Sequence, residues 1–146
     1  LGTHPISRER LAAIKAEVSK YPATGQSASS DFFTAQSEIK ARGPGLKLVA
    51  EARRAITDRQ FSIALQLTER ALKSLPNEHS VWRLQAELLV TNKKPRKAIQ
   101  SALKVRELNP KDPISELLLS YCYSAAGDII NSSRAKRRAQ SLIRRL

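Results

Sequence analysis

Few side chains in this sequence could do metal or nucleophilic chemistry. His4 and His79 are the only histidines, and Cys122 is the only cysteine. A zinc site needs three or four ligands, and the sequence contains no HExxH, P-loop, GxSxG or paired-cysteine motif. We therefore expect no catalytic centre in this chain. His79 is expected to be an exposed first-turn residue, and Cys122 a buried small hydrophobe without a disulfide partner.

Basic residues are the most abundant groups that could bind a ligand. The formal net charge is +13, and no acid follows Asn131. Six cations near the end of the chain define a basic face: Arg134, Lys136, Arg137, Arg138, Arg144 and Arg145. This face is either a solvated side of a last helix or a docking surface for an acidic partner. The lack of interleaved aromatic residues argues against nucleic acid, whereas an acidic protein and an anionic membrane surface both fit the charge.

The spacing of apolar residues predicts helices that would position these groups. A helix is expected over 5–20, a polar linker over 22–30, and a short helix over 31–39 that Gly43-Pro44-Gly45 ends. Further helices are expected over 46–57, 60–74, 78–91, 95–107, 113–126 and 128–145. No strand-like alternation of useful length is present, and no apolar run approaches the roughly 20 residues of a membrane span.

A period of 34 residues organises the second part of the chain. Small residues recur at this step, as in Ala52, Ala86 and Ser120 or in Ala64, Ala98 and Ser132, and Pro76 and Pro110 share it. Paired helices with this period are typical of the tetratricopeptide repeat. The sequence therefore predicts an all-α fold of tetratricopeptide-repeat hairpins, stacked in a short right-handed solenoid. Its units would be 45–78, 79–112 and 113–146 within a domain that spans 31–146. Trp82 and Tyr123 fall where this repeat family favours Trp and Tyr.

Stacked repeats leave a curved surface made by the first helix of each pair. The side of each first helix that does not pack inward predicts a peptide-binding groove, formed by Arg53, Ile56, Arg83, Glu87, Leu117 and Tyr121. Aliphatic walls with two arginines favour an extended or helical peptide of acidic character. The alternative is that the groove packs against another part of the same protein, such as a catalytic domain.

The first residues suggest a wider context. The segment Thr3-His4-Pro5-Ile6-Ser7-Arg8-Glu9-Arg10-Leu11 resembles the THPxxxER(I/L) segment that closes the catalytic domain of bacterial periplasmic HExxH zinc metallopeptidases with a tetratricopeptide tail. This family acts in outer-membrane protein quality control. Ser30-Asp31-Phe32-Phe33 and the units from Gly45 follow in the order typical of the family.

The resemblance implies that this chain is the non-catalytic C-terminal part of a zinc-dependent metalloendopeptidase, and that 1–21 is the end of its catalytic domain. Zinc would then be bound by upstream residues, with His4 near the metal cleft of the full-length protein. A periplasmic location and the recruitment of unfolded or partly assembled substrates are implied in the same way. Because residue 1 is Leu, we expect the chain to be a fragment or a processed product. The alternative is a stand-alone tetratricopeptide adaptor or assembly factor without a peptidase.

Overall fold

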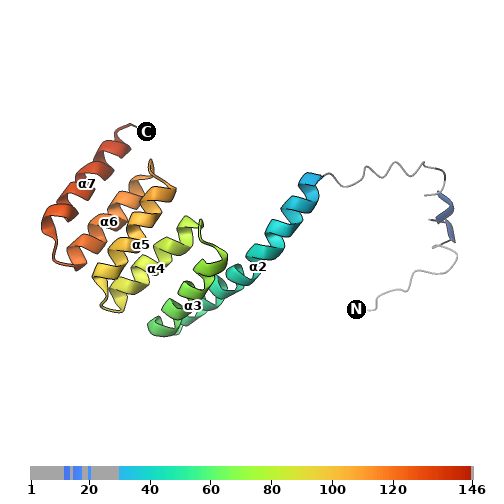
Figure 1. Cartoon of the computed structure of the whole chain (residues 1–146), viewed down its shortest axis with the longest axis horizontal. Helices are drawn as coiled ribbons and strands as arrows, with labels where there is room; N and C mark the ends of the chain where they lie inside the picture. Colours follow the sequence, from blue (N-terminus) through green and yellow to red (C-terminus); the bar gives the residue numbers. More distant parts are fainter. Residues whose placement is uncertain (1–11, 14, 18–19, 21–29, 146) are drawn as a thin grey trace. The chain divides into compact units, whose positions relative to one another are not determined.

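The computed structural model describes residues 12–13, 15–17, 20 and 30–145 (Figure 1). The chain divides into two units, Leu1–Ser37 and Glu38–Leu146. In the first unit, residues 12–13 and 15–17 are helical, in agreement with the helix expected over 5–20. Lys20 Nζ lies 2.9 Å from Glu17 Oε2 in this segment. His4, the whole segment from Thr3 to Leu11 and residues 22–29 of the predicted linker lie outside the described residues, whereas Ser30, predicted as the end of the linker, is the first residue of α2.

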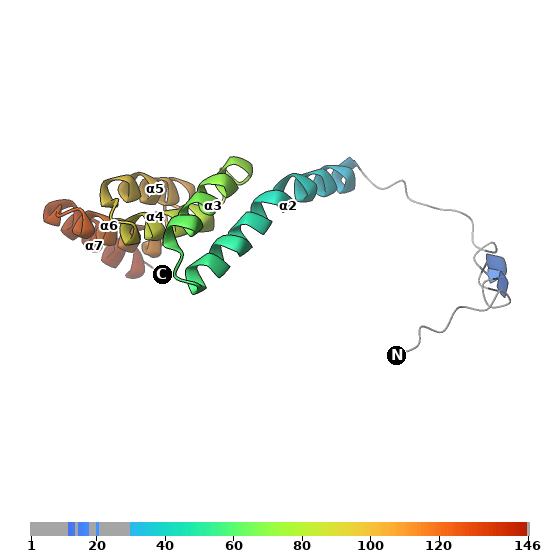
Figure 2. The ribbon, with the colours of Figure 1, turned by 90° about the horizontal axis from the view of Figure 1, so that it is seen from below.

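The described residues form helices and no strands, so the fold is all-α. The helices are α2 (Ser30–Thr57), α3 (Phe61–Ser74), α4 (His79–Thr91), α5 (Pro95–Leu108), α6 (Pro113–Ala125) and α7 (Ile129–Ile143). The bounds of α3 to α7 agree with the predicted helices to within two residues at each end. Consecutive helices from α3 onward pack against each other, and α4 also contacts α6 (Figures 1 and 2).

The prediction that Gly43-Pro44-Gly45 ends a short helix is wrong. Helix α2 begins at Ser30 and continues through Pro44 to Thr57. Proline costs one backbone hydrogen bond inside a helix, but its ring also clashes with the Cβ atom of the preceding residue. Gly43 has no Cβ atom, which removes this contact, although the ring still crowds the carbonyl of Lys40. Gly45 is buried, and a Cβ atom there would lie 2.7 Å from Leu75 Cγ. Gly45 therefore permits the close approach of α2 to the end of α3.

Three turns share one backbone geometry at the predicted spacing of 34 residues. Arg59, Lys93 and Gly127 have positive φ angles of 57°, 57° and 79°. The next amide in each turn donates to a carbonyl five residues earlier, from Gln60 to Ala55, Lys94 to Leu89 and Asp128 to Tyr123, at 2.8, 2.8 and 2.9 Å. This bond, with a residue of positive φ before it, is the Schellman end of an α-helix. The 34-residue period is thus present in the backbone as well as in the sequence.

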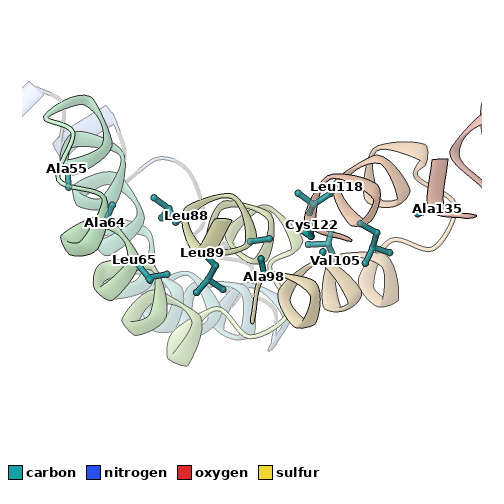
Figure 3. Packing of buried hydrophobic residues seen from close by; sticks show 13 residues of the cluster. Ala55, Ala64, Leu65, Leu88, Leu89, Ala98, Val105, Leu118, Cys122 and Ala135 are labelled. Atoms are coloured by element: carbon teal, nitrogen blue, oxygen red, sulfur yellow. The ribbon is translucent and has the colours of Figure 1, made fainter. Parts of the chain in front are cut away.

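Small residues at the repeated positions allow the helices to pack closely. Ala52, Ala64, Ala86 and Ala98 have no exposed surface. Where serines replace alanine in the last pair, Ser132 Oγ donates to the carbonyl of Ser120 at 2.9 Å. The main core cluster runs from Ala55 through Leu89 and Val105 to Ala135 (Figure 3), and a second cluster joins Ala71, Leu72, Leu75 and Val81. Because side chains from consecutive helices fill each layer, burial of apolar surface fixes the order of the helices.

Two aspartates begin the last two helices. Asp112 accepts a hydrogen bond from the amide of Ile114 at 2.9 Å before α6, and Asp128 accepts one from the amide of Asn131 at 3.0 Å before α7. Both are N-caps that satisfy amides without a partner inside the helix. The bond from the Asn131 amide, followed by one from the Asn131 side chain, lowers the pKa of Asp128.

Candidate binding surfaces

Helix α6 exposes three large apolar side chains on one side. Ile114, Leu117 and Tyr121 are 51%, 46% and 50% exposed. Their spacing of three and four residues places them on one face of the helix. The opposite face buries Leu118, Leu119 and Cys122 in the core. An exposed aromatic residue beside two aliphatic ones gives α6 an apolar strip that a partner could cover.

The neighbouring helix α4 contributes charge to the predicted groove. Arg83 Nε lies 3.5 Å from Glu87 Oε1, and both side chains are about half exposed. Since α4 contacts α6, the Arg83–Glu87 pair lies on a helix next to the one that carries the apolar strip. The glutamate offsets part of the arginine charge, so an acidic ligand would compete with Glu87 for the guanidinium.

The α2 residues of the predicted groove are divided between surface and core. Arg53 is exposed, whereas Ile56 is half-buried and packs against the main core cluster. All six predicted groove residues therefore retain some accessible surface, but Ile56 also contributes to helix packing. Among these six residues, all within the described part of the chain, Arg83 and Glu87 form an ion pair.

The cations of the basic face lie around much of α7. Arg137, Arg144 and Arg145 line one hollow together with Gln140 and Ser141. Arg134 and Arg138 line a different cavity, between α7 and the preceding helices. Lys136 is exposed, and the helical step of about 100° per residue turns it by roughly 200° from Arg138. In the described part of the chain, none of the six forms an ion pair with an acidic side chain.

Glu116 on α6 is the functional candidate that the sequence did not single out. Only 4% of this residue is exposed, and it lies 34 positions after Trp82. Trp82 fills its own position by packing against both core clusters, and its Nε1 donates to the carbonyl of Pro76 at 2.7 Å. A glutamate in the equivalent position is smaller and charged. The 34-residue period could have indicated this site, because it aligns Glu116 with Trp82, which packs in the core.

The residues expected to be inert have the surroundings expected for them. Cys122 has no exposed surface, and burial, with a smaller contribution from the Glu87 carboxylate, raises the pKa of its thiol to about 11. His79 is exposed in the first turn of α4. Within the described residues, no group of three or more His, Cys, Asp or Glu side chains could hold a metal ion. Their helices also include none that is long and apolar enough to span a bilayer.

No protein-family model matches this chain, and no curated protein sequence matches it significantly.

Proposed function

We propose that this chain is a protein–protein interaction module built from tetratricopeptide-type repeats. The observation that carries the proposal is the exposed strip of Ile114, Leu117 and Tyr121 on α6, next to a helix that presents Arg83 and Glu87. The 34-residue recurrence of the turns supports stacked hairpins, in which the first helices share one surface. An extended or helical peptide with apolar anchors and acidic flanks is the ligand chemistry that fits these side chains.

In the same proposal, the module recruits substrates or partners for a periplasmic zinc metallopeptidase. This part rests on the segment from Thr3 to Leu11, which lies outside the described residues. Zinc would be bound upstream, and His4 would approach the metal only in the full-length protein. The protein-coding sequence upstream of Leu1 tests this link: an HExxH helix is expected there, and its absence from a complete reading frame would refute the peptidase connection without affecting the binding module.

The binding proposal can be tested with a peptide selected from a random displayed library against the full chain. We expect Leu117→Ser and Tyr121→Ala each to weaken that peptide about tenfold or more, because burying such a side chain contributes roughly 1.5–3 kcal/mol. Ile63→Ser on α3 is the matched control, since Ile63 is 48% exposed and Leu117 is 46% exposed. Calorimetry on folded variants gives the affinities. An unchanged affinity in both α6 variants would count against this surface.

The charged pair provides a second test with opposite signs. For a peptide with acidic flanks, Arg83→Gln should weaken binding, whereas Glu87→Gln should strengthen it by freeing Arg83. Rim charges contribute modestly, so changes of about two- to fivefold are expected, decreasing with added salt. Arg96→Gln, an exposed arginine at the start of α5, is the control for charge alone. Equal effects of Arg83→Gln and Arg96→Gln would indicate attraction by the net charge rather than a groove.

A further inference from the structure

Glu116 is a buried carboxylate whose hydrogen bonding is incomplete. Its Oε1 lies 3.8 Å from Arg106 Nη1, which is too long for a hydrogen bond. Its Oε2 is buried and has no hydrogen-bond partner among the described residues. A buried acceptor without a donor is costly, and a buried carboxylate more so. The position therefore suits a ligand that can donate a hydrogen bond to Oε2.

The cavity beside Glu116 is lined mainly by positive charge. It has a volume of about 130 Å³, several times the ~30 Å³ that one water occupies in the liquid. Its lining residues come from α5, α6 and α7: Arg106, Glu116, Leu119, Tyr123, Asn131, Arg134, Ala135 and Arg138. An adjoining cavity also includes Glu116 and Arg138 and adds Arg145. Four arginines thus line the two cavities around one carboxylate.

The identity of these side chains restricts the ligand. Four guanidinium groups disfavour a metal cation or an amine and favour an anion that accepts several N–H bonds. Glu116 Oε2, in contrast, requires a donor on that same ligand. A carboxylate or a sulfate carries no proton near neutral pH, so either would place an oxygen lone pair against Oε2. Hydrogen phosphate keeps one O–H group and offers three acceptor oxygens.

We propose that the cavity between α5, α6 and α7 is a hydrogen-phosphate site. Arg106, Arg134 and Arg138 bind the anionic oxygens, and Glu116 Oε2 accepts a hydrogen bond from the remaining O–H group. The loss of the tryptophan at this repeat position creates the space, and the glutamate gives selectivity for a protonated oxyanion. The site does not depend on the proposed peptide groove, which uses other side chains on α4 and α6.

The full chain can be titrated with inorganic phosphate and with sulfate at pH 7 and equal ionic strength. We expect saturable binding of phosphate and at least tenfold weaker binding of sulfate. Arg138→Gln should weaken phosphate about tenfold or more, consistent with the loss of a charge-assisted bond. Arg137→Gln is the matched control, because Arg137 lines the other hollow on the same helix. It should leave phosphate affinity unchanged.

Glu116→Gln tests the selectivity directly. The amide can donate a hydrogen bond, so this variant should bind sulfate as well as it binds phosphate. If the variant fails to fold, the affinities of the unaltered chain and of Arg138→Gln for phosphate and for sulfate still test the proposed site. The proposal is wrong if both anions bind equally to the unaltered chain, if neither binds saturably, or if Arg137→Gln and Arg138→Gln have the same effect.

Discussion

Cys122 shows how the surroundings of one residue make stability depend on pH. Its side chain is fully buried on α6, and burial, with the Glu87 carboxylate adding to it, raises the thiol pKa from 9.0 to about 11. The unfolded chain releases this proton near the ordinary value, whereas the folded chain holds it to higher pH. The contribution to stability is therefore complete below pH 9 and is lost as the pH rises to about 11.

We accordingly expect the free energy of unfolding to fall more steeply over this pH range in the unaltered chain than in Cys122→Ala. The shift corresponds to a difference of up to about 3 kcal/mol across the range. Denaturant titrations at several pH values measure both slopes, and every other ionisable group is common to the two proteins. Parallel curves for the two proteins would contradict the predicted pKa.

Glu116 illustrates what sequence reasoning at the level of residues could not supply. The burial of Cys122 and the exposure of His79 followed from residue type and position alone, and the structure confirms both placements. The burial of a glutamate did not follow, because charged residues are ordinarily exposed. It arises from the packing of α5 and α7 against the side of α6 that carries position 116. Only the period that aligns Glu116 with Trp82 indicated this side in advance.

At the scale of the helix, local signals placed most boundaries correctly. Pro95 and Pro113 begin α5 and α6, and a residue of positive φ follows the ends of α2, α4 and α6. The same reasoning gave a wrong prediction at Gly43-Pro44-Gly45. Glycine and proline can end a helix in one setting and be accommodated inside a helix in another. Glycine beside proline usually breaks a helix. Here Gly45 is required by the side chain of Leu75 on α3, a tertiary contact that no local pattern reveals.

This interpretation predicts different outcomes for two similar substitutions in α2. Gly45→Ala would place a Cβ atom 2.7 Å from Leu75 Cγ and 3.1 Å from Ser74 Cβ. Overpacking of this kind costs roughly 1–3 kcal/mol, which exceeds the ~1 kcal/mol gained in helix propensity. Apart from its two chain neighbours and the backbone of its own helix, Gly43→Ala meets no atom within 4 Å, and its gain in propensity is offset by the clash with the neighbouring Pro44 ring. We expect it to change stability by less than about 1 kcal/mol.

Chemical denaturation of both variants measures the difference. A loss of stability in Gly45→Ala, with Gly43→Ala close to the unaltered chain, would support close packing as the role of Gly45. Equal effects of the two alanines would instead indicate that both glycines act only through the backbone of α2.

At the scale of the whole molecule, both core clusters of the described residues lie in the second unit. The two core clusters and the side chains packed on them extend from Leu48 to Ala135. Ala64, Ala86 and Ala98, which recur with the 34-residue period, belong to the main cluster. The sequence could not assign a role to residues 31–44, because their apolar side chains are few. Ile39, in this segment, is 71% exposed.

A fragment of residues 38–146 should therefore be nearly as stable as the full chain. It retains both core clusters and the Arg42–Glu78 ion pair at 2.7 Å, so we expect its Tm to lie within about 4 °C of the full-length value. A fragment of residues 50–146 is the matched comparison. It lacks Leu48 and Val49, which pack on the second cluster, and Tm should fall by roughly 10 °C or more. Thermal unfolding followed by circular dichroism distinguishes the two cases. If both fragments lose the same stability, the residues before Glu38 contribute to the fold in a way that the division into two units does not describe.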